Sequence, residues 1–179
     1  MAMTLITTNT SSNAATSDFT SGIDSTYKLY IFKFIDLNPA TDAQDFSFQG
    51  NAASGSGYNE TITSTFFLAA HKEDDSFGLL VYKTEYDQAQ GTSFQTLNYS
   101  VGADADQSYS GYLKIYNPSS TTFVKHFMST SCINEKGGAV YESFVSGYFN
   151  TTSAIDEIQF KFSSGNTDAG DICLYGITT

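Results

Sequence analysis

Two histidines and several carboxylates are the residues of this chain whose types could support catalysis. Histidine is the commonest general base near neutral pH. His71 stands in an acidic stretch, and His126 lies between Lys125 and Phe127. Neither belongs to a G-x-S-x-G or an H-E-x-x-H motif. Because a histidine without a recognisable partner in the sequence is seldom catalytic, we expect both to have structural or surface roles.

Paired carboxylates are the second route to catalysis, because glycoside hydrolysis needs two of them. Candidate glutamates are spread along the chain at Glu60, Glu85, Glu142 and Glu157, and no signature favours one pair. Tryptophan is absent, so a sugar-stacking platform would have to be built from the 12 tyrosines. The sequence therefore predicts a non-enzymatic protein with no catalytic residues and no cofactor, and it leaves carbohydrate binding open.

Two acidic clusters are candidates for Ca²⁺ binding: EDDS, which contains Asp74 and Asp75, and DADQ, which contains Asp104 and Asp106. Calcium takes several oxygen ligands from flexible loops, and each cluster offers two or three. Neither cluster has the Asp, Asn and Gly spacing of a dedicated calcium loop. We therefore predict a solvated turn at each cluster, with calcium binding as the alternative, and assign no metal site.

The two cysteines, Cys132 and Cys173, each lie in a strand-like run without a C-x-x-C motif or a histidine at metal-binding spacing. Buried free thiols are the favoured interpretation, because a free cysteine packs as a small hydrophobe. A disulfide between them would require an oxidising compartment and adjacent strands. The sequence alone leaves this pairing open.

The net charge of −11 comes from 19 acidic residues and 8 lysines that are spread singly along the chain. Binding to phosphates or anionic lipids needs clustered Lys or Arg, so nucleic acid and membrane surfaces are excluded as partners. The first residues lack the basic start and the apolar core of a secretion signal. We therefore expect synthesis in the cytoplasm without classical export.

The elements that must position these residues are predicted to be β-strands. Phe and Tyr, 15 and 12 in number, favour the half-buried surface of a sheet. Near the C-terminus, Ile158, Phe160 and Phe162 alternate with polar residues, and a Gly, Asn and Asp turn separates them from a second apolar run, 172–177. This pattern predicts a β-hairpin over 154–177.

The most apolar segment is 27–37, in which both strand parities are apolar. It predicts a central strand that is covered on both faces, or one whose outer face meets another subunit. The whole chain contains about ten strand-like runs at regular spacing, and both prolines lie in turns. We therefore predict an all-β, antiparallel β-sandwich with little or no helix, as a single domain over 17–179. Residues 1–16 are expected to form an N-terminal arm, extended or in contact with a neighbouring subunit.

Several motifs resemble a set of tailed-phage virion proteins that are abundant in marine and freshwater phages. The motifs are FTSGIDSTY, YKLYIFKFIDLNPATD, YNET, DADQ, NPSSTTFVKHF, NTTSAIDEIQFKFSSGN and GDICLYGI. They cover nearly the whole chain and consist of turns and strand edges without a chemical role. The resemblance implies a β-sandwich of jelly-roll type that serves as a capsid decoration (cement) protein or as part of the tail or fibre. It transfers no catalytic residue.

A decoration protein of this kind would bind the major capsid protein or other virion proteins, commonly as a homotrimer over a symmetry axis. Its expected location is the virion, on the capsid surface in preference to the tail. Aromatic residues are enriched at interfaces, and the candidates for subunit contacts are Tyr27, Tyr30, Phe32, Phe34, Tyr109, Tyr112 and Tyr116. The alternative is a tail or fibre module that binds a host-receptor glycan through tyrosine-lined loops.

Overall fold

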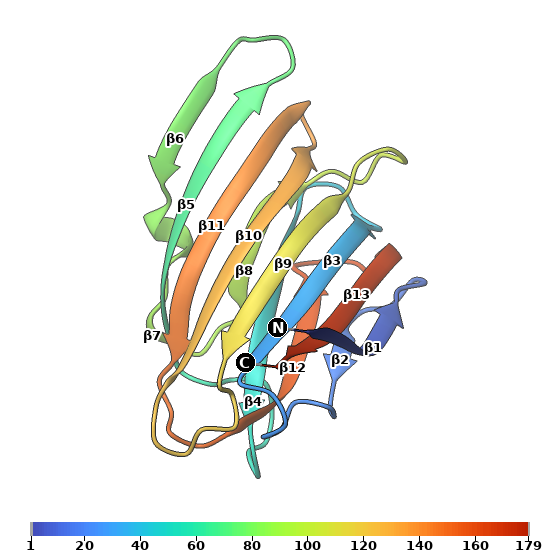
Figure 1. Cartoon of the computed structure of the whole chain (residues 1–179). Coiled ribbons are helices and arrows are strands. Elements are labelled where there is room, and N and C mark those ends of the chain that lie inside the picture. Colours follow the sequence, from blue (N-terminus) through green and yellow to red (C-terminus); the bar gives the residue numbers. More distant parts are fainter. Residues whose placement is uncertain (1, 179) are drawn as a thin grey trace.

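The computed structural model describes residues 2–178, which fold almost entirely into antiparallel β-strands (Figure 1). The strands are β1 (Met3–Thr10), β2 (Ser17–Phe19), β3 (Leu29–Pro39), β4 (Gln44–Ala52), β5 (Ile62–Lys72), β6 (Gly78–Tyr82), β7 (Ala89–Gly91), β8 (Gln95–Val101), β9 (Tyr109–Tyr116), β10 (Lys125–Glu135), β11 (Ala139–Phe149), β12 (Ile155–Phe162) and β13 (Thr167–Ile177). One short 3-10 helix, η1 (Thr84–Tyr86), follows β6. The predicted all-β antiparallel fold is confirmed, with 13 strands in place of about ten.

All 13 strands belong to one hydrogen-bonded sheet that folds back on itself. The front layer runs in the order β1-β13-β3-β9-β10-β11-β5-β6, and β7 pairs with one end of β5. The rear layer runs in the order β8-β4-β12-β2. The two layers meet where Glu135 of β10 pairs with Val101 of β8. In Figure 1, β4, β8 and β12 lie behind the front layer.

Aromatic side chains fill the space between the two layers. The Phe160 ring of β12 lies with its centroid 5.0 Å from that of Phe32 and 5.2 Å from that of Phe34, both on β3. Phe48 of β4 meets Phe127 of β10 at 5.0 Å. These pairs are close to edge-to-face, which stabilises them beyond the area that they bury. Because side chains alternate between the faces of a strand, every second residue of the front layer is committed to this core.

The last two strands lie where the sequence predicts them, but they do not form a hairpin. β12 pairs with β4 and β2 in the rear layer, whereas β13 pairs with β3 and β1 in the front layer. Residues 163–166 therefore carry the chain from one layer to the other. The predicted hairpin over 154–177 is wrong because Phe160 and Leu174 enter the same core from opposite sides. Period-two alternation identifies a strand without identifying its partner.

Residues 3–10, expected to belong to an arm, form β1 within the sheet. They pair with β13 from Met3 opposite Ile177 to Thr10 opposite Asp171. Ala14 also pairs with the residue that begins β13. The N-terminal segment is therefore ordered by its own chain, through backbone hydrogen bonds along the last strand, and does not require a neighbouring subunit. Among residues 2–178, no helix has the length and apolar character that crossing a membrane requires.

One lysine is buried at the end of the front layer. Lys125 is 0% exposed, and its Nζ donates hydrogen bonds of 3.0 Å to the carbonyls of Phe123 and Thr151. Desolvation lowers its pKa, and the charge of Glu60 acts in the opposite direction. The two carbonyls belong to the loops that precede β10 and β12. The ammonium group therefore fixes these two loops to one another.

We predict that Phe160→Ala lowers the free energy of unfolding by about 3–5 kcal/mol, because it opens a cavity in the aromatic core. The control is Phe123→Ala, since Phe123 is 67% exposed in the loop between β9 and β10. Its expected change is within about 0.5 kcal/mol. Urea denaturation followed by circular dichroism measures both. Equal losses in the two variants would contradict the assignment of Phe160 to the core.

Candidate interaction surface

The front layer exposes most of the large apolar side chains on the side turned away from the rear layer, which we call the outer face. In the part of the chain that the structure describes, eleven large hydrophobic side chains are exposed. Strand register places nine of these on the outer face: Met3, Leu5, Ile35, Phe67, Leu80, Tyr82, Tyr116, Met128 and Val140. Contiguous apolar patches mark interaction sites, whereas single exposed residues do not.

A continuous row of side chains crosses the centre of the outer face. Tyr112 of β9 is paired with Thr130 of β10, and Thr130 is paired with Phe144 of β11. Phe144 is paired with Phe67 of β5, which in turn lies opposite Tyr82 of β6. The Phe144 and Phe67 rings stack with centroids 4.8 Å apart. Cross-strand aromatic pairs of this kind stabilise a sheet, and here they do so on an open surface.

A hollow of about 580 Å³ lies on the outer face where small residues meet across β5 and β11. Thr65 is paired with Ser146 at this point, so neither side chain fills the space. Larger side chains line the same hollow: Tyr116, His126, Met128 and Tyr148. A neighbouring hollow of about 160 Å³ shares Met128 and Ser146 and reaches the row of Phe67 and Phe144. Together they form a groove across four strands.

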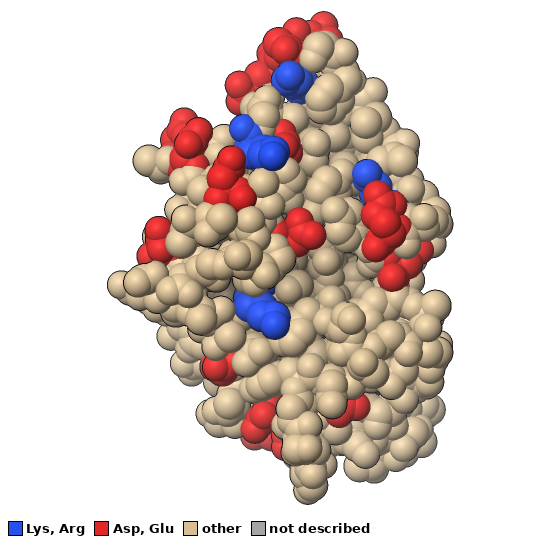
Figure 2. Space-filling view, turned by 180° about the vertical axis from the view of Figure 1, so that it is seen from behind, with Lys and Arg blue, Asp and Glu red and all other residues tan. Residues whose placement is uncertain are grey.

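Strand register places some charged side chains on the outer face between its apolar residues, among them Lys33 of β3, Lys114 of β9 and Glu142 of β11. Lys114 Nζ lies 4.6 Å from the centroid of the Tyr112 ring, an arrangement in which the ring face attracts the ammonium. The central row from Tyr112 to Tyr82 contains no charged residue. Figure 2 views the molecule from behind, where acidic side chains are scattered over the surface. The row across the centre of the outer face is therefore uncharged in a protein with a net charge of −11.

Four of the seven predicted contact residues lie in the core. Tyr30, Phe32 and Tyr109 are 0% exposed and Phe34 is 2% exposed. These residues of β3 and β9 point toward the rear layer, where Phe34 packs against Phe46 with ring centroids 5.4 Å apart. They cannot reach a partner, so this part of the prediction is wrong. The reason is that the sequence shows two apolar parities in 27–37 but not which of them is covered.

Three of the predicted contact residues remain accessible. Tyr112 and Tyr116 lie on the outer face, whereas Tyr27 is half-buried beside Tyr30. The sequence reasoning missed Phe67 and Met128, which are 42% and 52% exposed. Their signal is an apolar residue directly after a buried phenylalanine, in FFLAA and in KHFM, since neighbours in a strand face opposite sides.

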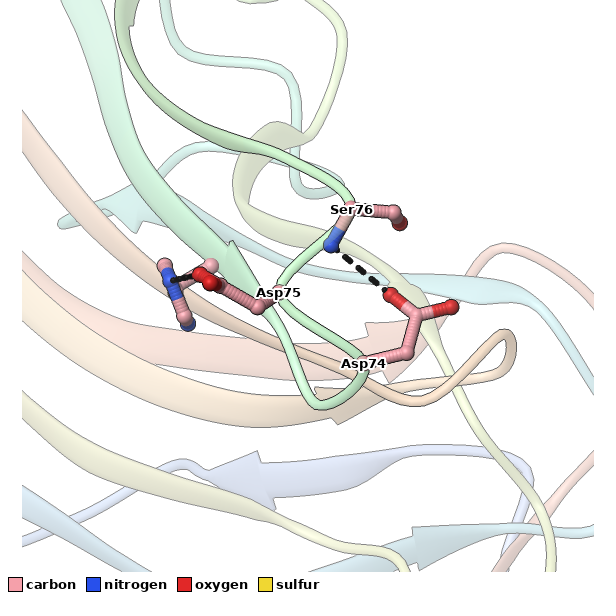
Figure 3. A network of polar contacts seen from close by, with 4 residues as sticks. Asp74, Asp75 and Ser76 are labelled. Carbon is pink, nitrogen blue, oxygen red and sulfur yellow. Dashed lines mark hydrogen bonds and ion pairs between the residues drawn. The ribbon is translucent and has the colours of Figure 1, made fainter.

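The two acidic clusters do not assemble into a cation site. The Asp74 carboxylate accepts the backbone N–H of Ser76 at 3.0 Å, and Asp75 pairs with His71 Nε2 at 3.1 Å (Figure 3). The two carboxylates thus point in different directions from one turn. Asp104 and Asp106 lie in the separate loop between β8 and β9. Within residues 2–178, no group of three or more His, Cys, Asp or Glu side chains could hold a metal ion.

The remaining candidate residues have separate environments. His126 lies on the outer face beside Tyr148, with ring centroids 6.0 Å apart. Glu60 accepts the backbone N–H of Ala52, and Glu157 accepts a hydrogen bond from the Asn51 amide, each at 3.0 Å. The other two glutamates considered for catalysis lie elsewhere. Glu85 forms an ion pair with Lys83, and Glu142 lies on β11. No catalytic arrangement emerges from these contacts.

Cys132 and Cys173 are both free thiols. They lie on β10 and β13, which are separated in the front layer by β3 and β9. A disulfide needs Cβ atoms about 3.5–4.5 Å apart. Two cysteines with two strands between them cannot meet this condition, so Cys132 and Cys173 do not pair. Cys132 is exposed and lies opposite Glu142. Partial burial raises the pKa of the Cys132 thiol, and the negative charge of Glu142 raises it further.

We predict that Cys132 reacts with a disulfide reagent at pH 8 more slowly than the thiols of the unfolded chain, because its raised pKa leaves less thiolate. Glu142→Gln should increase the rate by removing the neighbouring charge. Asp156→Asn, on β12 of the rear layer, is the control and should leave the rate unchanged. Absorbance of the released thiolate measures each rate. Equal rates in the Glu142 and Asp156 variants would contradict the electrostatic coupling.

Comparison with known proteins assigns no family to this chain. No protein-family model, no curated protein and no solved structure matches it. The resemblance to tailed-phage virion proteins therefore remains a prediction from sequence motifs. The function has to be argued from the outer face, which is the most distinctive surface of the molecule.

Proposed function

We propose that this chain is a non-enzymatic structural protein that binds a macromolecular partner through the outer face of its front layer. The observation that carries the proposal is the placement of nine of the eleven exposed large hydrophobic side chains on that one face. Leaving such a patch in water is unfavourable by about 25 cal/mol for each Å² of apolar surface. A partner that covers the patch recovers this free energy.

The chemistry of the outer face suits a protein partner. Aromatic residues and methionine are enriched at the centres of protein interfaces, whereas Glu and Asp are depleted there. The row of Tyr112, Phe144 and Phe67 has this composition, and Met128 lies beside it in the groove. We infer that these side chains form the energetic centre of the interface, because hot spots cluster near the middle of a contact.

The resemblance to tailed-phage proteins supplies the setting. We propose that the chain is made in the host cytoplasm and is added to the virion, where it decorates and stabilises the head by binding the major capsid protein. A sandwich of jelly-roll type is part of the same proposal. Its support is that early strands pair with late ones in both layers, β3 with β13 and β4 with β12, as happens when a long double strand is wrapped into two facing sheets.

We predict that Met128→Glu weakens attachment to purified heads of the phage that encodes the chain by at least about tenfold, which corresponds to about 1.4 kcal/mol. The acidic side chain would be buried unpaired at the interface. The control is Phe123→Glu, which adds the same charge at an exposed position in the loop between β9 and β10, outside the lining of the groove. Co-sedimentation with mass-spectrometric copy counting measures attachment.

Many copies for each particle, lost with Met128→Glu and retained with Phe123→Glu, would support decoration of the head. A few copies for each particle would remove the head from the proposal and favour the tail or fibre. Equal attachment of the two variants would overturn the outer face as the contact. Folding of each variant is checked beforehand by its circular dichroism spectrum and its urea midpoint.

A glycan-binding module of the tail or fibre is the second candidate, favoured by the hollow of about 580 Å³. Its lining includes Tyr116, His126 and Tyr148, whose rings can stack on the apolar faces of sugars. In the prediction from sequence, tyrosine-lined loops bind the sugar. In this second proposal the sugar-binding residues lie on strands of the front layer instead. The hydroxyls of Ser146 and Thr65 could accept or donate hydrogen bonds at the floor.

We predict for this candidate that the protein binds immobilised glycans and that Tyr148→Ala lowers the signal at least about tenfold through lost stacking. Tyr82→Ala is the matched control, because Tyr82 is 56% exposed on the same face but lies outside the lining of the hollow. A glycan array measures both variants. An array without binding, or an equal loss in the two variants, would remove the candidate.

A further inference from the structure

β6 is a free edge of the front layer, paired with β5 along one side only. Two backbone hydrogen bonds flank this ladder, from Lys72 N–H to the Phe77 carbonyl and from Lys83 N–H to the Phe66 carbonyl. In an antiparallel pair the bonded residues alternate, so the odd-numbered residues of β6 bond to β5. The even-numbered residues direct their N–H and C=O groups away from the sheet: Gly78, Leu80 and Tyr82.

The side chains of β6 leave this edge unprotected. Leu80 and Tyr82 are 74% and 56% exposed on the outer face, and Leu79 is 44% exposed on the opposite side. The segment contains no charged residue and no proline. Proteins usually blunt an exposed edge strand with Lys, Pro, a bulge or a very short strand. β6 uses none of the first three devices, and its five residues suffice for several hydrogen bonds.

Two other terminal strands of the sheet, β1 and β2, are blunted. β1 has a register shift between Leu5 and Thr7, which interrupts its regular hydrogen bonding. β2, at the end of the rear layer, has three residues, one of which is Asp18. A regular and uncharged apolar edge therefore occurs at β6, in a protein whose net charge is −11.

We propose that two copies of this chain associate by pairing β6 with β6 in antiparallel register, with the two-fold axis at Leu80. In this register Gly78 of each copy faces Tyr82 of the other, and Leu80 faces Leu80. All the outward-directed backbone groups then find partners, in about six hydrogen bonds. The three residues with outward-directed backbone groups are arranged symmetrically about Leu80. A second, antiparallel copy of the same edge can therefore pair with all three, as a two-fold interface requires. The two front layers become one continuous sheet.

Charge also favours a second copy as the occupant, and it predicts a salt dependence. No like charges come together over Gly78–Tyr82, because the segment has none. At its ends, the turn with Glu73, Asp74 and Asp75, where Lys72 pairs with Asp74, approaches the segment after β6 of the other copy. In that segment Lys83 pairs with Glu85, and Asp87 adds a further negative charge. Both segments keep a net negative charge after these ion pairs are counted. This flanking repulsion is screened by salt, so the association should strengthen as the NaCl concentration rises. The pairing uses the sheet edge and is independent of the function proposed above.

Cysteine trapping tests the register directly, in a Cys132→Ser background that removes the exposed native thiol. Leu80→Cys places two thiols across the axis, where bonded antiparallel residues have Cα atoms about 5.5 Å apart. This separation falls within the range of disulfides. Tyr82→Cys is the matched control on the same strand, since its two copies would be separated by roughly 14 Å along the strands. Non-reducing electrophoresis after mild oxidation measures the cross-linked fraction.

We expect a cross-linked dimer with Leu80→Cys and at least about tenfold less with Tyr82→Cys. Sedimentation velocity of the unmodified chain should give twice the mass of one chain, and Leu80→Pro should return it to one, because proline removes an outward N–H without breaking a bond to β5. Met128→Lys, on the outer face, should leave the dimer intact. If Leu80→Pro does not fold, Leu80→Lys replaces it, since that side chain is largely exposed.

Several results would overturn the proposal. If the dimer had a dissociation constant of about 1 μM, it would predominate at a protein concentration of about 100 μM. A chain that stays monomeric up to this concentration would exclude the pairing. A trimer, which the phage resemblance implies, would need a different interface from a two-fold edge pair. Equal cross-linking of the Leu80 and Tyr82 cysteines would show that collision, not register, joins the chains. Loss of the dimer in Met128→Lys would assign the contact to the outer face.

Discussion

The alternation of side chains between the two faces of a strand is the constraint on which the rest of this structure depends. Phe32 and Phe34 of β3 meet Phe160 of β12 across the space between the layers. Once these rings are buried, every second residue of each front strand has its direction determined. The hydrogen-bonded register then determines which residues of each neighbouring strand face the core. The aromatic core and the outer face therefore both result from the alternation of side chains along the strands.

The outer face is unusual because several front strands carry large apolar residues on both parities. Phe66 and Phe127 are buried, while their neighbours Phe67 and Met128 are exposed. An antiparallel layer with a solvated face normally carries polar residues there. Here the carboxylates lie chiefly in turns and on other surfaces, as around Asp74 in the turn after β5. A strongly acidic chain can therefore keep an apolar surface that is available for a partner.

The two ends of the front layer differ in how they manage unpaired backbone. β1 pairs with β13, and the register shift between Leu5 and Thr7 interrupts the regular backbone along the free edge of β1. β6 has no comparable device, and its uncharged side chains leave the backbone open. The sheet folds back at the contact of Glu135 with Val101 but does not close into a ring at these ends. Unpaired edge groups therefore persist at β6, a strand without charged residues.

The sequence by itself determined most of the strands and the all-β class, because period-two alternation and Gly, Asn, Asp and Pro signals act within a few residues. Segment 154–177 shows the limit: both of its strands were predictable, yet β12 and β13 belong to different layers. The parity of 27–37 shows the same limit, since Tyr30 and Ile31 are both apolar and only packing buries Tyr30 completely. Strand partners, buried faces and the free edge at β6 were decided by tertiary structure, because each depends on residues that are distant in the chain.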